Sequence, residues 1–127
     1  MDIISTSNLF ESFVRRYSIG TNSRTRFQAS FLSALNHALI DLANWMAIDE
    51  QPFLESLEDD CELTLRYLPF LSVGVAHFLQ QEAEWVKGEA RDQYSELNWR
   101  RAKGEAADLK TQAKEEAGTY GPWGDSQ

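Results

Sequence analysis

The sequence predicts an all-α protein, a small bundle of about four helices with a long C-terminal helix and an extended C-terminal tail. Apolar residues recur at three- and four-residue spacing over long stretches, which is the period of one helix face. Hydrophobic residues make up 43% and charged residues 25% of the 127 residues, as in folded globular proteins. The last ten residues break the helical pattern with turn-forming types. We therefore expect one helical domain over residues 1–117 and a tail over 118–127.

The first helix is expected to begin near Ser7 or Asn8. Asn8 can cap the free N–H groups, and Glu11 follows three residues later, as in a capping box. Apolar residues then share one face of the helix: Phe10, Phe13, Val14 and Tyr17. Residues 18–23 contain Gly, Asn and Ser and predict a turn.

The second helix is expected over residues 24–47, because one apolar stripe continues through this whole segment. The stripe consists of Phe27, Phe31, Leu32, Leu35, Ala38, Leu39, Leu42, Trp45 and Met46. Residues 27–31 also fit a short alternating strand. Helix is the better interpretation because the helical period persists for several turns beyond them.

An acidic segment follows, with seven carboxylates and no base between Asp49 and Glu62. Pro52 favours a break followed by a new helix. If Ser56 caps that helix, the acids from Glu58 to Glu62 lie at its N-terminus, where the helix dipole favours them. A calcium site is the alternative interpretation, but calcium loops place a Gly at their sharp turn, and this segment has none.

The most apolar run of the chain, Leu63–Leu79, predicts the central helix of the bundle. Pro69 inside it predicts a kink or a break, because proline removes one hydrogen bond and crowds the preceding turn. Gly74 either allows a neighbouring element to pack closely or simply lowers the stability of the helix by an amount that the fold tolerates. Cys61, just before the run, is expected to be a buried apolar residue. His77 is expected to be structural, because no acidic residue lies at a spacing from it that would indicate a general base or a metal ligand.

A long charged helix is expected from about Trp85 to Ala117. Its thin apolar stripe consists of Ala83, Val86, Ala90, Tyr94, Leu97, Arg101 and Ala102. Glu96–Arg100 and Arg101–Glu105 are opposite charges four residues apart, which stabilise a helix slightly. Gly88 and Gly104 weaken it. A helix this polar commonly lies on a surface or spans between subunits.

The sequence contains no catalytic, cofactor or metal signature, and we expect no enzyme. It lacks a Gly-rich phosphate loop, G-x-S-x-G and H-E-x-x-H. A net charge of −8 disfavours binding nucleic acid by bulk charge. No apolar run is long enough for a membrane span, and the first residues lack the basic region of a secretion signal. The protein is therefore expected to be made in a cytoplasm.

The tail from Gly118 combines turn residues with two large aromatics, Tyr120 and Trp123. Aromatic residues of this kind are enriched as interface anchors. Tyr120, Pro122 and Trp123 are therefore our candidate partner-binding residues. The alternative is that the aromatics fold back on their own helix.

The order of these elements resembles the head–tail adaptor proteins of tailed bacteriophages, also called connector or head-completion proteins. The resemblance covers roughly Phe27 to Ala107. It rests on an Asn/Ala/Leu helix, an acidic entry, the apolar run Leu63–Leu79, then Trp85 and Tyr94-x-x-Leu97 in a charged helix. Pro69 and the aromatic tail depart from the pattern and leave the subtype open.

The resemblance implies that residues 1–117 are an adaptor domain of a virion neck protein made in the host cytoplasm. Such proteins form a ring, typically of twelve copies, beneath the portal protein. The ring presents a surface to the next neck or tail component, and DNA passes through its bore without specific binding. An acidic bore would let DNA pass without holding it.

Two other classes of function remain open. The chain could be a small helical regulatory protein that binds a partner protein. It could also be a small DNA-binding bundle that uses the local basic cluster around the first turn, which consists of Arg15, Arg16, Arg24 and Arg26.

Overall fold

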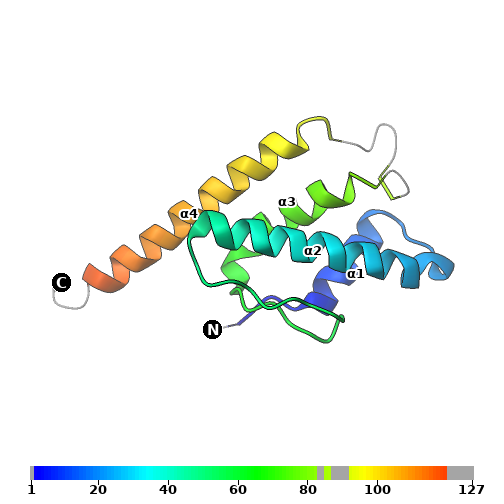
Figure 1. Ribbon diagram of the computed structural model, residues 1–127, viewed down its shortest axis with the longest axis horizontal. Coiled ribbons are helices and arrows are strands. Elements are labelled where there is room, and N and C mark those ends of the chain that lie inside the picture. The colour runs from blue at the N-terminus through cyan, green and yellow to red at the C-terminus, as the bar shows by residue number, and fades with distance from the viewer. Residues whose placement is uncertain (1, 83–84, 87–91, 120–127) are drawn as a thin grey trace.

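The computed structural model describes residues 2–82, 85–86 and 92–119, with side chains described to residue 112. The regular structure in these residues is four α-helices, two short 3-10 helices and one isolated bridge, which confirms the all-α class. The helices are α1 (Thr6–Arg16), α2 (Arg24–Met46), α3 (Leu68–Leu79) and α4 (Ser95–Thr119). In Figure 1, α4 is inclined to α2 and passes its C-terminal end, and the loop 47–64 runs along the opposite side of α2.

Helix α1 begins two residues earlier than the sequence predicted, because Ser5 and not Asn8 is its N-cap. The Ser5 hydroxyl oxygen accepts the N–H of Asn8 at 3.2 Å. The predicted capping box is therefore wrong, and Glu11 instead forms an ion pair with Arg24 at the start of α2. The apolar face was predicted correctly: Phe10 and Phe13 are buried against α2.

Helix α2 matches the predicted range to within one residue, and the strand alternative at 27–31 is wrong. Most of the predicted stripe is buried in the core. Trp45 is the exception, with half of its surface exposed. The helix ends at Ala47, whose φ of 55° lies in the left-handed region, a common way for a helix to stop.

Residues 47–64 form an irregular loop, so the helix expected from the acidic segment is wrong. The amide of Asn36 on α2 accepts the N–H of Leu54 at 2.8 Å and donates to its carbonyl at 2.9 Å. The carboxylate of Asp59 accepts the N–H groups of Glu55 and Ser56 at 3.0 and 3.2 Å. These side chains satisfy backbone groups that a helix would otherwise have paired.

The end of the loop pairs with the N-terminal segment in place of starting a helix at Leu63. The N–H of Ile4 donates to the Leu63 carbonyl at 2.9 Å, and Ile3 and Thr64 form the isolated bridge. Cys61 is buried beside Thr6, as predicted. The N-terminal segment thus closes the loop against the bundle.

Helix α3 begins at Leu68, so Pro69 lies in its first turn and kinks nothing. The expected interior position of Pro69 is wrong. A proline in the first turn is tolerated, because the N–H that it lacks has no helical partner there. Leu71, Val75 and Leu79 are buried on the face that α3 turns to the core.

Helix α4 begins at Ser95 and extends to Thr119, two residues beyond the predicted end of the domain. Its predicted stripe is right for Val86 and Ala102, which are buried, and wrong for Tyr94 and Leu97, which are exposed. The buried side consists of Trp99, Ala102, Lys103 and Ala106. Glu96 and Arg100 form the predicted pair at 3.5 Å. Arg101 forms no ion pair with Glu105 or any other residue described. Ala83, Gly88 and Ala90 lie outside the described residues.

Candidate functional site

A group of hydrogen-bonded polar side chains lies where α4 meets α2 and α3, and this junction is the candidate functional site. Trp99 on α4 fits against α3 at Gly74. A Cβ added to Gly74 would lie 2.5 Å from the indole ring. Gly74 is therefore a point of close packing, and the missing side chain makes room for Trp99.

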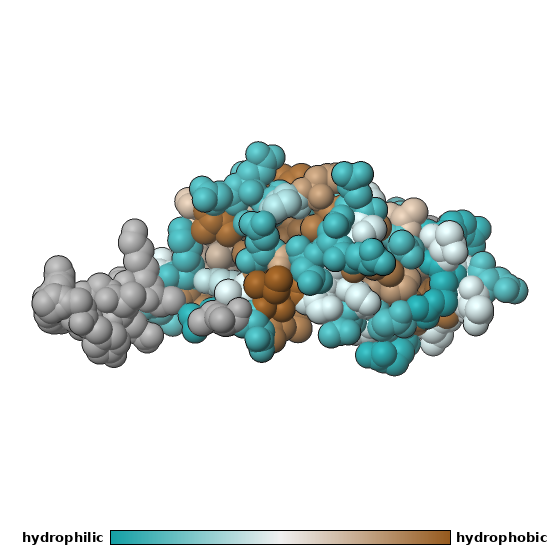
Figure 2. All heavy atoms as spheres, turned by 90° about the horizontal axis from the view of Figure 1, so that it is seen from below, coloured by the Kyte–Doolittle hydropathy of each residue, from teal (hydrophilic) through white to brown (hydrophobic). Residues whose placement is uncertain are grey.

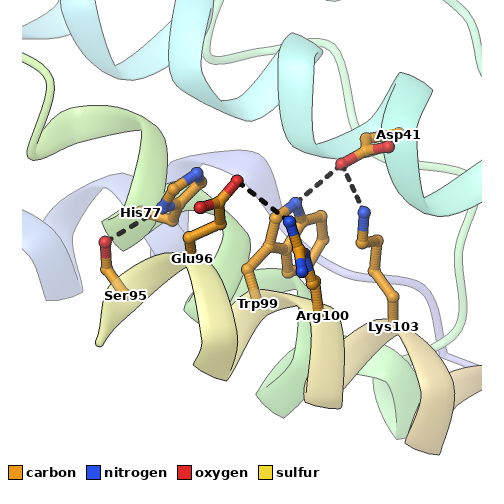
Figure 3. Close-up of polar contacts among 7 residues, drawn as sticks. All are labelled: Asp41, His77, Ser95, Glu96, Trp99, Arg100 and Lys103. Carbon is orange, nitrogen blue, oxygen red and sulfur yellow. Dashed lines mark hydrogen bonds and ion pairs between the residues drawn. The ribbon is translucent and has the colours of Figure 1, made fainter.

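Asp41 on α2 joins the two helices through a single carboxylate oxygen. Its Oδ2 accepts hydrogen bonds from the indole N–H of Trp99 at 2.7 Å and from Nζ of Lys103 at 2.9 Å. Figure 3 shows Trp99 and Lys103 rising from α4 toward Asp41. The Lys103 ammonium also lies 4.9 Å from the ring centroid of Trp45. Lys103 is thus buried with its charge paired, as burial of an ammonium requires.

A second lysine of α4 caps the C-terminus of α2. Nζ of Lys110 donates to the carbonyl of Met46 at 2.7 Å. Carbonyl groups at a helix C-terminus lack intrahelical partners, and the helix dipole favours a cation there. Lys103 and Lys110 together fix α4 along the end of α2.

His77 on α3 contacts the start of α4, where its Nδ1 lies 3.0 Å from the hydroxyl oxygen of Ser95. Burial lowers the pKa of His77 and Lys103 adds to this effect, while Glu96 and Asp41 oppose it. The imidazole is therefore neutral at pH 7. No carboxylate is hydrogen-bonded to His77 among the residues described, and this contact ties α3 to α4, in keeping with the structural role predicted.

A groove of about 620 Å³ opens beside this junction. It runs between α3, α4 and the end of α1, and its lining includes Tyr17, Phe70, Val73, His77, Ser95 and Arg101. Burial raises the pKa of Tyr17, and the neighbouring Arg16 opposes the shift. The lining also includes charges of both signs, from Arg16, Arg101, Asp92 and Glu105.

Three arginines of the predicted basic cluster contact aromatic rings of the bundle. Arg16 lies over the rings of Phe13 and Tyr17, and Arg24 lies over Phe10. Arg26 lies 5.2 Å from the ring centroid of Trp85. These guanidinium groups pack the surface of α1 and α2, and a duplex would have to compete with those contacts.

The acidic segment presents its carboxylates to solvent, and the part of the chain that the structure describes contains no cluster of metal-ligating side chains. None of the helices described is both long and apolar enough to cross a bilayer. The predicted partner-binding residues Tyr120, Pro122 and Trp123 lie outside the described residues, so their role stays a prediction.

The sequence did not single out Asp41, Trp99 and Lys103, which form the junction. Asp41 is 58 residues from Trp99 and 62 from Lys103 in the chain, and the only local signal was a tryptophan that did not fit the predicted stripe. Comparison of the chain with protein-family models, with curated proteins and with solved structures finds no match.

Proposed function

We propose that the protein is a structural adaptor of a tailed-bacteriophage neck, which acts by binding other proteins and transforms no molecule. In this proposal, copies of the chain form a ring, in number close to twelve. The ring binds the portal on one side and the next neck or tail component on the other, and DNA passes through its bore.

The placement of α4 carries the proposal. One side of α4 is fixed to the bundle by Trp99, Lys103 and Lys110. The other side leaves Tyr94 and Leu97 exposed. The orange end of α4 extends past the end of α2 in Figure 1. A long helix fixed along one side and open along the other suits contacts with neighbouring subunits.

Other exposed apolar side chains support a protein-binding role. Trp45 and Phe53 are large and mostly open to solvent, and aromatic residues are enriched at the centres of protein interfaces. The acidic loop supplies negative charge that would repel the DNA backbone. The tail residues Tyr120, Pro122 and Trp123 are proposed as anchors on the portal or on an adjacent subunit.

The test is electron-microscope imaging of the purified chain mixed with candidate portal rings. We expect added density on one face of the portal ring, with the symmetry of that ring. A chain lacking residues 118–127 should bind portals more weakly, and undiminished binding would contradict the role of the tail. Absence of binding to portals would contradict the adaptor proposal itself and favour a small regulatory protein.

A further inference from the structure

A second groove lies on the side of α2 that is turned away from α4. We call it the underside groove, and it has a volume of about 630 Å³. Helix α2 contributes Leu32, Asn36 and Ile40, and the loop contributes Phe53, Leu54 and Glu55. Figure 2 shows this underside of the molecule, where apolar areas lie open among polar ones.

Phe53 is a preorganised anchor at the edge of the underside groove. Its side chain is 70% exposed, yet the next residue, Leu54, is fixed to Asn36 by two hydrogen bonds. An exposed aromatic on a fixed backbone loses little conformational entropy when a partner covers it. The groove is therefore built to be covered by an apolar surface.

The rim of the groove is acidic. Glu55 lines it, and Glu50 lines a smaller adjoining hollow that shares Phe53 and Ile40. Both carboxylates are exposed, and neither forms an ion pair with any residue that the structure describes. A partner that fits should therefore carry apolar side chains followed by a cation.

Helix α4 carries that combination on its outer side. We call Tyr94, Leu97 and Arg101 the α4 stripe. Tyr94 directly precedes the helix, and Leu97 and Arg101 are four residues apart on one helix face. All three are exposed, and Arg101 has no ion-pair partner among the described residues. Asp92 fixes the start of the stripe, since its carboxylate accepts the N–H of Tyr94 and the side-chain amide of Asn98 at 2.8 Å each.

The α4 stripe cannot enter the underside groove of its own chain. Asp41, which reaches α4, and the groove residues Leu32 and Asn36 are on different faces of α2. Tyr94 and Leu97 are exposed, unlike the buried Trp99 and Lys103. Arg101 lines the groove between α3 and α4, which shares no residue with the underside groove.

We infer that the α4 stripe of one copy docks in the underside groove of a second copy, with Leu97 against Phe53 and Arg101 near Glu55. This is the helix-in-groove mode of recognition. The two surfaces differ and share no residue, so the contact is heterologous and propagates into a ring or an open chain. The inference deepens the proposed function, because it names the surfaces that would join neighbouring subunits, and it rests on that proposal.

The test is the oligomeric state of the purified full chain, measured by sedimentation and native mass spectrometry over a range of concentrations. The wild-type chain should associate. Leu97→Asp and Phe53→Asp should each weaken association by about tenfold or more, since each places a charge in a contact that buries a large apolar side chain. Leu65→Asp is the matched control: Leu65 is also half exposed and lies outside both surfaces, so its association should not change.

Mixing the variants tests the heterologous geometry directly. Leu97→Asp keeps an intact groove and Phe53→Asp keeps an intact stripe, so the mixture should form a one-to-one pair that grows no further. Each variant alone should associate about tenfold or more weakly than the wild-type chain. Arg101→Glu should weaken association, and Arg101→Glu mixed with Glu55→Arg should recover it. Circular dichroism should show the same helix content in all variants, because every changed side chain is exposed.

A wild-type chain that stays monomeric, or a Leu97→Asp chain that associates like wild type, would overturn the inference. A mixture that stays monomeric would also overturn it. These failures differ from failure of the adaptor proposal. A monomer that still coats portal rings would support the adaptor proposal and would mean that a different protein binds the underside groove. Self-association through these surfaces without portal binding would support the docking inference and contradict the adaptor proposal.

Discussion

Helix α4 and the loop 47–64 are both polar segments attached to α2, yet they are held in opposite ways. Helix α4 satisfies its own backbone and is fixed by side chains that reach α2 and α3, chiefly Trp99 and Lys103. The loop pairs its backbone with another segment at its end, where Leu63 meets Ile4, and elsewhere side chains such as Asn36 satisfy its peptide groups. Removal of one side chain should therefore cost packing energy at α4. At the loop, it should instead leave backbone groups without hydrogen bonds.

The largest effect is expected for Trp99→Ala at the junction of α3 and α4. Replacing a buried Trp or Phe by Ala costs about 3 to 5 kcal/mol, and Trp99 is 2% exposed. Urea denaturation should show this loss in the free energy of unfolding. Trp45→Ala is the matched control: it removes an exposed ring and a cation–π contact of about 1 kcal/mol or less. Equal losses in the two variants would contradict the description of the junction.

Asn36→Ala should loosen the loop. It leaves the N–H and the carbonyl of Leu54 without partners, and an unsatisfied buried group costs about 1 to 3 kcal/mol. We expect the variant to lose about 2 kcal/mol of unfolding free energy. The buried thiol of Cys61, whose pKa burial raises, should also react faster with iodoacetamide. Asn44→Ala, on an exposed position of the same helix, should change neither measurement appreciably.

Two glycines should respond to the same substitution with opposite signs. Gly74→Ala forces a methyl group into the Trp99 ring, and overpacking of this kind costs about 1 to 3 kcal/mol. Gly104→Ala meets no atom within 4 Å and should stabilise α4 by up to about 1 kcal/mol, because Ala favours helix over Gly. The melting temperatures of both variants measure these effects. A rise for Gly74→Ala would mean that Trp99 does not occupy the space.

The smallest effect is expected from His77. Its pKa is lowered in the folded protein, chiefly by burial, so below the unfolded value of about 6.5 the unfolded chain binds more protons. Stability should therefore fall as the pH drops through about 6.5. Unfolding measured from pH 7.5 to 5.5 should show a shallower decline for His77→Gln than for wild type. Parallel declines would contradict the buried, neutral imidazole.

The sequence predicted elements whose evidence is local and missed those whose evidence is distant. The apolar period of α2 runs without interruption, and its range was predicted to within one residue. The sequence around Pro69 is compatible with a proline in the interior of a helix or in its first turn. Pro69 lies in the first turn because Leu63 pairs with Ile4, so the helix cannot begin at Leu63. No local pattern indicates that Asn36 binds a peptide group eighteen residues away.

The candidate site was less predictable than the fold. More than one face of α4 carries a few apolar residues, so the sequence alone does not show which face is buried. The face that contains Trp99 is buried because the indole ring fits against α3 at Gly74. Asp41 and Lys103 meet across sixty-two residues of chain, so their pairing follows from the packing and not from their spacing. Tyr120 and Trp123 were chosen for their residue types alone, and their role depends on a partner.

The cap that Lys110 places on α2 is the last hydrogen bond described between α4 and the rest of the bundle. The helix continues to Thr119, which adds about 14 Å at 1.5 Å per residue. The length of this segment determines both how far α4 extends and in which direction its end points. Inserting one residue after Lys110 would rotate whatever follows by about 100°, while inserting seven would restore the heading to within about 20° and place it about 10 Å farther out. The number of residues between Lys110 and Thr119 therefore fixes the direction in which the end of α4 points.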